Sequence, residues 1–247
     1  MSLVAHILAE CDLPFRYERV SPFVGATHAD AHKARNPLEK IPSLLDSSGL
    51  LISESQAICR YLARTQPAAR KFYPCDDPVQ CAEVDALADF ITFSLSGPFF
   101  NWFVIGGYFP KAFRLKAEEE SRIFGTWSMV TIGDALRRLL ESSKLSPFLL
   151  GSEPFLPDFH LFHVLRLGKT FSRTFEIPFM DLAAGDDALK TFYDVMASRP
   201  STKVILEAQD AEFPVTEREL FGEFGDAYQE RLKPAKAALQ ALFGHEV

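Results

Sequence analysis

A hairpin pattern that runs directly into a helix pattern constrains the fold of this 247-residue chain more than any other feature. Two apolar runs, 41–45 and 50–52, flank the segment 46–49 (Asp-Ser-Ser-Gly), whose composition is typical of a tight turn. A hairpin centred on the middle of that turn pairs Pro42 with Ser53. The sequence therefore predicts two short antiparallel strands, with residues 41–42 beside the start of the next element.

The next element is predicted to be a helix. Ser53 and Gln56 have the spacing of a capping box. Apolar residues then recur with helical spacing at Ala57, Ile58, Tyr61 and Leu62. Two interpretations of Ser53-Glu54-Ser55 stay open at this point. The segment is a helix cap alone, or it is a cap that also presents helix N-terminal N–H groups to a small anionic ligand.

The rest of the chain divides into a mixed first quarter and a helical remainder. A helical apolar pattern covers Val4, Ile7, Leu8 and Cys11. Alternation over 15–20 predicts a strand, and the proline-rich segment 65–78 predicts a linker. Beyond the linker we predict a helix with the stripe Val84, Leu87, Ala88 and Ile91, a helix over about 117–142, one from near Asp158, one over 189–196 and a short last helix after Pro200. Residues from about Glu212 are predicted to form a separate tail.

Composition narrows the classes of function. With 47% hydrophobic residues the chain can form one large core or two smaller ones. A net charge of −7 and the shortness of its basic runs argue against nucleic acid as a partner. The longest aromatic apolar stretch, 97–109, is too short to span a bilayer, so we expect no membrane partner. Four cysteines without a C-x-x-C pair predict free thiols and a cytoplasmic location.

Several motifs resemble those of a known family. NPLEKIPSL (36–44), LISESQAICRYLA (51–63) and FYPCDDP (72–78) are similar to cytosolic glutathione S-transferases, with the theta-like branch the most similar. GSEPFLPDFHLFHVL (151–165) and FYDVMASRPSTKVIL (192–206) resemble later helical landmarks of that family.

The resemblance covers about residues 1–208, and it implies a fold class. We expect an α+β thioredoxin-like N-terminal domain, incomplete at its start, followed by an all-α C-terminal domain. The expected boundaries are 1–66 for the first domain, 67–78 for the linker, 79–211 for the helical domain and 212–247 for a C-terminal extension.

The resemblance also implies a site for glutathione, the family's co-substrate. The backbone of Ile41, before a cis Pro42, would pair with the cysteinyl backbone of glutathione like an added strand. Ser55 and the helix N-terminus would bind the γ-glutamyl carboxylate. Glu54 would accept from the γ-glutamyl ammonium. Lys40 would approach the glycyl carboxylate.

Two departures from the family pattern are visible. The family lowers the pKa of the glutathione thiol with a Ser, Tyr or Cys near the end of its first strand. This sequence begins in the helix that follows, so we expect the first strand and the thiol-activating residue to be absent from it; Ser2 and Cys11 are poor substitutes. Either the natural protein starts upstream or the chain is a degenerate homologue. The second departure is Phe155 at the first position of a capping box that keeps Asp158, which would cost about 1 kcal/mol.

An aromatic cluster is the candidate for a hydrophobic substrate pocket. Its residues are Phe93, Phe99, Phe100, Trp102 and Phe103, with Tyr108 and Phe109 beyond. The alternative is that they form ordinary core or dimer contacts. Either of Asp85 and Asp89 could lie near glutathione, by family position. The pairs His28/His32 and His160/His163 lack the further ligands of a metal site, so we predict none.

Together these features predict a glutathione S-transferase-like homodimer that conjugates the glutathione thiolate to hydrophobic electrophiles. The alternative is a non-catalytic protein-interaction module with the same fold. A reductase that uses a cysteine is a weaker third possibility.

Overall fold

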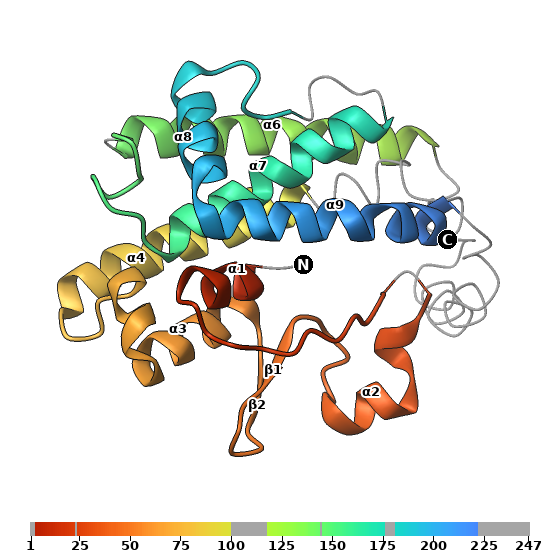
Figure 1. Cartoon of the computed structure of the whole chain (residues 1–247). Helices are drawn as coiled ribbons and strands as arrows, with labels where there is room; N and C mark the ends of the chain where they lie inside the picture. The colour runs from red at the N-terminus through yellow and green to blue at the C-terminus, as the bar shows by residue number, and fades with distance from the viewer. Residues whose placement is uncertain (1–2, 23, 100–117, 144, 176–180, 222–247) are drawn as a thin grey trace, which may run out of the picture.

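The computed structural model describes residues 3–22, 24–99, 118–143, 145–175 and 181–221. In chain order its elements are α1 (Leu3–Glu10), η1 (Ala26–His28), α2 (Asp30–Arg35), β1 (Ser43–Leu45), β2 (Leu51–Ser53), α3 (Ser55–Thr65), η2 (Pro67–Phe72), α4 (Pro78–Phe90), η3 (Ile91–Ser96), α6 (Glu118–Ser142), α7 (Leu156–Phe175), α8 (Asp187–Ser198) and α9 (Pro200–Phe221). The elements up to α3 lie on one side, α4 and α6–α8 lie on the other, and α9 runs along α1 between them (Figure 1).

The hairpin prediction is confirmed, but its register is shifted. β1 and β2 pair antiparallel with Ser43, not Pro42, opposite Ser53. β1 begins at Ser43, so the first two residues of the expected strand precede the ladder. Ile41 and Pro42 nevertheless lie next to the residues that follow β2.

The turn between the strands explains the shift. The Asp46 carboxylate accepts from the N–H groups of Ser48 and Leu50, at 2.8 and 2.9 Å, and Gly49 adopts φ +88°. These bonds centre the turn on Ser48, whereas the predicted pairing centred it between Ser47 and Ser48. Asp46 also accepts from the Tyr61 hydroxyl at 2.5 Å, which ties the hairpin tip to α3. Hydrogen bonds, first from Ser48 and then from Tyr61, lower the pKa of Asp46 to about 2.

The strand predicted over 15–20 is wrong. The segment has no sheet partner among the described residues, and Tyr17 is 44% exposed. Side chains hold it instead: Glu18 pairs with Arg35 at 2.7 Å, and the Tyr17 hydroxyl donates to Glu212 at 3.4 Å. Alternation alone does not make a strand, because a strand needs a hydrogen-bonded neighbour.

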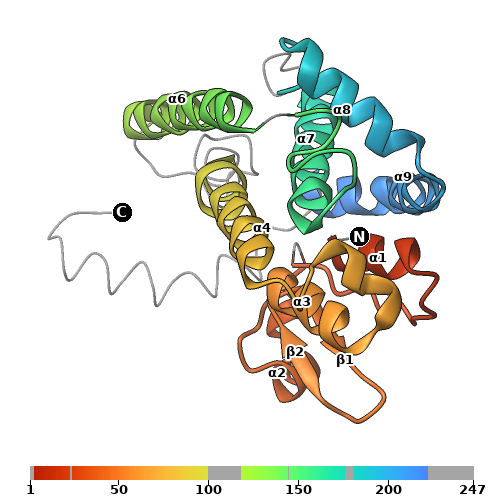
Figure 2. The ribbon, with the colours of Figure 1, turned by 90° about the vertical axis from the view of Figure 1, so that its left-hand side faces the viewer.

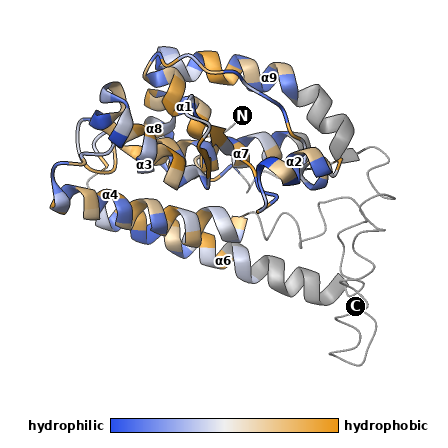
Figure 3. Ribbon diagram, turned by 90° about the horizontal axis from the view of Figure 1, so that it is seen from below, coloured by the Kyte–Doolittle hydropathy of each residue, from blue (hydrophilic) through white to orange (hydrophobic). Residues whose placement is uncertain are grey.

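One hydrophobic core runs through both sides of the molecule. Fully buried residues include Ile7 of α1, Ile58 of α3, Val84 of α4, Phe159 of α7 and Phe192 of α8. Helix α1 lies between α3 and α9 and also contacts α7 (Figure 2). Its colouring in Figure 3 is mostly hydrophobic, in keeping with this central place. The helical stripe predicted from Val4, Ile7 and Leu8 is therefore confirmed.

Polar contacts join α1 to the distant helices. His6 hydrogen-bonds His163 of α7 at 3.1 Å and Thr202 of α9 at 2.9 Å. One turn later, Glu10 accepts from Arg199 and Ser201, at the junction of α8 and α9. These groups, here called the α1 junction, are a polar layer inside the otherwise apolar contact between the two sides of the molecule.

A π-helical turn alters the direction of the side chains after α4. The predicted stripe is confirmed, with Val84, Ala88 and Ile91 buried. Over Ile91–Ser96 the helix is wider than an α-helix, so successive side chains rotate less per residue. As a result Phe93 points outward and is 74% exposed, whereas Phe99 is 1% exposed in the core.

The last helix is longer than predicted. α9 continues to Phe221, beyond Glu212, so the helix itself is longer than the short last helix that was expected; the C-terminal extension over 212–247 stays a prediction. Its described side chains make tertiary contacts as far as Glu212, including Arg166 of α7 with Asp210 at 2.5 Å and Tyr17 with Glu212 at 3.4 Å. Residues 222–247 lie outside the described part of the chain.

The start of α7 keeps half of its capping box. Asp158 is fully buried and accepts from the N–H groups of Phe155 and Leu149, both at 2.8 Å. The carboxylate therefore closes the first turn and also holds the preceding loop, although Phe155 supplies no hydroxyl.

Candidate functional site

The hairpin brings the predicted site residues together. Ile41-Pro42 directly precedes β1, and Glu54-Ser55 directly follows β2. Because Ser43 pairs with Ser53, these two segments lie side by side. The Ile41–Pro42 peptide bond is cis, as the resemblance implied. Ile41 is 44% exposed, and its backbone lies before the first ladder pair.

Asn36 holds this arrangement, and the sequence reasoning did not single it out. Its buried side chain donates to the Lys40 carbonyl at 2.7 Å and accepts from the Ser53 hydroxyl at 3.1 Å. One side chain thereby joins the segment before β1 to the end of β2. The Asn-Pro pair at 36–37 indicates a turn, but no spacing rule connects it with Ser53.

The capping box predicted for Ser53 and Gln56 is wrong. α3 begins at Ser55, so Glu54 is the N-cap, with φ +69° and no side-chain hydrogen bond to the first turn. The Ser53 hydroxyl is directed to Asn36 instead, and the Gln56 amide bonds His160 at 2.9 Å.

The first turn of α3 therefore has no side-chain cap. The first backbone N–H to bond within the helix is that of Ile58, which donates to the Glu54 carbonyl at 2.9 Å. The N–H groups of 55–57 precede it and point out of the helix end, where the helix dipole favours negative charge. The Ser55 hydroxyl lies at the same end. This combination suits a carboxylate ligand.

Lys40 is exposed beside the same hairpin edge. Among the described residues its ammonium forms no hydrogen bond or ion pair. Its neighbour Glu39 has φ +56° and bonds His28, with Lys33 3.7 Å away. Lys40 is thus the cation of this edge that is available to a second carboxylate.

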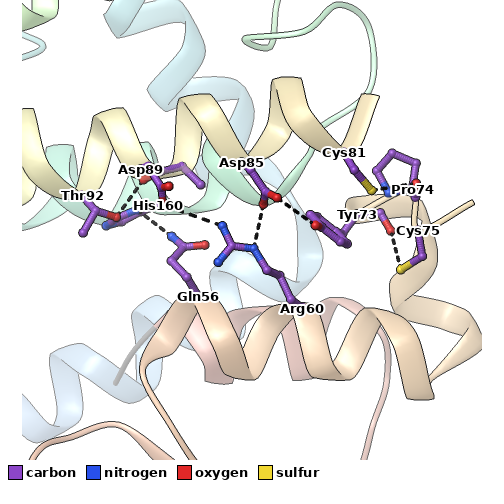
Figure 4. Close-up of polar contacts among 11 residues, drawn as sticks. Gln56, Arg60, Tyr73, Pro74, Cys75, Cys81, Asp85, Asp89, Thr92 and His160 are labelled. Atoms are coloured by element: carbon purple, nitrogen blue, oxygen red, sulfur yellow. Dashed lines mark hydrogen bonds and ion pairs between the residues drawn. The ribbon is translucent and has the colours of Figure 1, made fainter. Parts of the chain in front are cut away.

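A polar network anchors α3 to α4 (Figure 4). Arg60 of α3 donates to Asp85 at 2.7 Å and lies 3.8 Å from Asp89. Asp85 also accepts from the Tyr73 hydroxyl at 3.0 Å. Burial, followed by the hydrogen bond to Asp85, raises the pKa of Tyr73 to about 12. Asp85 and Asp89 of α4 therefore both face Arg60, and Asp85 also accepts a second hydrogen bond, from Tyr73.

The structure describes two of the five pocket candidates. Phe93 is exposed and Phe99 is buried against Phe171, with ring centroids 6.1 Å apart. The other three, Phe100, Trp102 and Phe103, lie outside the described residues, as do Tyr108 and Phe109. The pocket stays a prediction.

Two buried cysteines are not thiolates near neutral pH. Burial raises the pKa of Cys11 to about 11 and that of Cys59 to about 12. Both thiols lie in the core around α1 and α3. A cysteine-based reaction at either position is therefore disfavoured.

Among the described residues, no group of three or more His, Cys, Asp or Glu side chains could hold a metal ion. In the same part of the chain, no helix is both long and apolar enough to cross a membrane.

The fold and the site together define a class: a small α+β domain with a cis-Pro hairpin and an uncapped helix, packed against a helical domain. Residues 4–65 match the family model of the glutathione S-transferase N-terminal domain. Glutathione S-transferase hmp2 of Hypomyces subiculosus is 36% identical over 67 residues, which are 27% of this chain and 31% of that protein. The chain thus matches about a third of the length of this relative.

Solved structures extend the likeness to the whole fold. A glutathione transferase homolog from Sulfitobacter with bound glutathione has a TM-score of 0.67 at 19% identity, covering 83% of this chain and 91% of that one. Poplar glutathione transferase F1 has a TM-score of 0.66 at 19% identity, covering 85% and 92%. A glutathione S-transferase from Xylella fastidiosa has a TM-score of 0.68 at 20% identity, covering 84% and 93%.

Residues 4–65 therefore match a glutathione S-transferase N-terminal domain, and the chain shares the fold of the glutathione transferase structures over 83–85% of its length. The predicted fold class, a thioredoxin-like domain followed by a helical one, is confirmed. The theta-like assignment stays a prediction.

Proposed function

We propose that the chain binds glutathione at the hairpin edge and the first turn of α3, and that it conjugates the glutathione thiolate to hydrophobic electrophiles in the cytoplasm. The observation that carries the proposal is the placement of Ile41-Pro42 beside Glu54-Ser55 at an uncapped helix N-terminus. The bound glutathione of the Sulfitobacter homolog supports the choice of ligand.

Each part of the tripeptide has a matching group at this site. The N–H groups of the first α3 turn and the Ser55 hydroxyl bind the γ-glutamyl carboxylate. The exposed Glu54 carboxylate accepts from the γ-glutamyl ammonium. The Ile41 backbone pairs with the cysteinyl residue, and Lys40 binds the glycyl carboxylate. The group that ionises the thiol is unassigned.

Ser55→Ala tests the site. We expect it to weaken glutathione binding at least tenfold in titration calorimetry, because a hydrogen bond to a charged group contributes about 1.5–3 kcal/mol. Thr65→Val removes a hydroxyl from the other end of α3, where it donates to the Tyr61 carbonyl, and should leave the affinity unchanged. Equal affinities for Ser55→Ala and the wild type would refute the assignment.

The non-catalytic alternative is separated from the enzyme by turnover. The purified chain should be mixed with glutathione and an activated aryl chloride, and thioether formation followed by absorbance. Turnover above the uncatalysed rate supports conjugation. Glutathione binding without turnover supports the interaction module.

The exposed apolar residues of α4, η3 and α6 support a homodimer. They are Val79, Phe93, Trp127 and Val130, each more than 60% exposed. The elements that carry Phe93, Trp127 and Val130 pack against each other, and neighbouring exposed apolar side chains indicate an interface. We expect the wild type to elute as a dimer in light-scattering chromatography, and Phe93→Asp with Trp127→Asp to elute as a monomer. A monomeric wild type at micromolar concentration would contradict this.

A further inference from the structure

Two histidines of α7 contact different helices of the N-terminal domain. His160 Nδ1 lies 2.9 Å from Gln56 Nε2 of α3, and His163 Nε2 lies 3.1 Å from His6 Nδ1 of α1. Figure 4 shows the Gln56 side chain reaching from α3 to His160. The His160–Gln56 contact is thus at the candidate site. The His163–His6 contact is at the α1 junction, outside that site.

Gln56 belongs to the turn that forms the candidate anion site. It directly follows Ser55, and its own N–H is among the donors that no helix carbonyl uses. The Gln56 amide oxygen is buried and has no hydrogen-bond partner in the described part of the chain. The hydrogen bond to His160 therefore fixes the Gln56 amide, and with it the Gln56 side chain in the first turn of α3.

The second anchor of α3 lies one turn further on. Arg60 holds the middle of the helix to Asp85 of α4. That contact fixes the helix axis, but it lies beyond the N–H groups of 55–57. The position of the first turn relative to the helical domain thus depends on the Gln56–His160 contact.

We propose that His160 is a positioning residue of the candidate glutathione site: by holding Gln56, it sets the first turn of α3 for the carboxylate. The inference rests on the proposed function, and it assigns the C-terminal domain a part in binding a ligand of the N-terminal domain. Burial lowers the pKa of His160 to about 4, so its neutral ring can accept from the Gln56 amide near pH 7.

His163 supplies the matched control, because it lies one turn away on the same helix and bonds a helix outside the site. His160→Ala should raise the glutathione Kd about tenfold, within the range of indirect couplings. His163→Ala should change the glutathione Kd less than twofold, even if it lowers the urea midpoint of unfolding as much as His160→Ala does. His160→Gln, which can still accept from Gln56, should restore most of the affinity.

A double mutant separates positioning from general weakening. Gln56→Leu should raise the Kd about as much as His160→Ala, and the two together should be no worse than either alone, since they remove one contact. Equal effects of His160→Ala and His163→Ala on the Kd, or additive effects of the Gln56 and His160 changes, overturn the proposal.

A ligand-free measurement distinguishes this inference from the proposed function. The Ile58 amide closes the first turn of α3, so His160→Ala should speed its hydrogen exchange about tenfold and His163→Ala should not. A wild type that does not bind glutathione refutes the proposed function. Unchanged Ile58 exchange in His160→Ala refutes the positioning role, whatever the ligand.

Discussion

Asp158→Ala is expected to lower the free energy of unfolding by about 3–5 kcal/mol. The carboxylate is fully buried and accepts from Leu149 and Phe155, both at 2.8 Å. Truncation leaves two N–H groups without a partner in the core, at about 1–3 kcal/mol each. Urea unfolding followed by far-UV circular dichroism measures the loss as a shift in midpoint at constant slope.

The matched control is another aspartate at a helix start. Asp186 is the N-cap of α8 and accepts from Leu189 at 2.9 Å, in a partly buried place. Asp186→Ala should cost only about 1 kcal/mol. Asp158→Asn should fall between the two, because its amide can accept one of the two bonds. Similar losses for Asp158→Ala and Asp186→Ala would show that Asp158 is an ordinary cap.

Acidification from pH 6.5 to pH 4 is expected to destabilise the protein strongly. Burial lowers the pKa of His6 and His160 to about 4 and that of His163 well below its usual value. A histidine whose folded pKa lies below its unfolded pKa contributes stability that is complete above pH 6.5 and is lost as the pH falls toward 4. Each shift to about 4 corresponds to a loss on the order of 3 kcal/mol.

Asp158 acts in the opposite direction over part of this range. Burial raises its pKa to about 6, so the folded state binds this proton before the unfolded state does, and stability rises as the pH falls from 6 toward 3.8. One such group offsets about one histidine. Three lowered histidines against one raised aspartate leave a net loss toward pH 4.

Urea titrations between pH 7.5 and pH 4 test this expectation. His6→Gln should flatten the dependence of unfolding free energy on pH, because one buried titrating ring is gone. His28→Gln controls for histidine loss itself, since His28 bonds Glu39 away from the α1 junction. Profiles of wild type and His6→Gln that run parallel would contradict the role of His6.

Local patterns were enough to predict most elements, because helices and turns depend on neighbours in sequence. The stripe at Val84, Ala88 and Ile91 is an example. The false strand at 15–20 had the right alternation, but a strand also needs a partner that sequence alternation does not supply. The length of α9 was not predictable from local sequence, since a proline disfavours helix at the residue before it, and α9 nevertheless continues through Phe213-Pro214.

The candidate site was predictable only in outline. Pairing across a turn brought Ile41-Pro42 to Glu54-Ser55 within one residue of the observed register. The detailed hydrogen bonds were not predictable, since Ser53 is bonded to a residue 17 positions away and Gln56 to one 104 positions away. Both contacts replaced the local capping box that the spacing favoured.

The α1 junction also has a consequence for synthesis on the ribosome. Glu10 and Arg199 are 189 residues apart in sequence, and His6 and Thr202 are 196 apart. At the usual rate of translation, roughly 10–40 s pass between the synthesis of α1 and the synthesis of Arg199 and Thr202. During that interval the apolar face of the newly made α1 lacks α7 and α9, so the nascent chain exposes hydrophobic surface that is prone to aggregation until these helices are made.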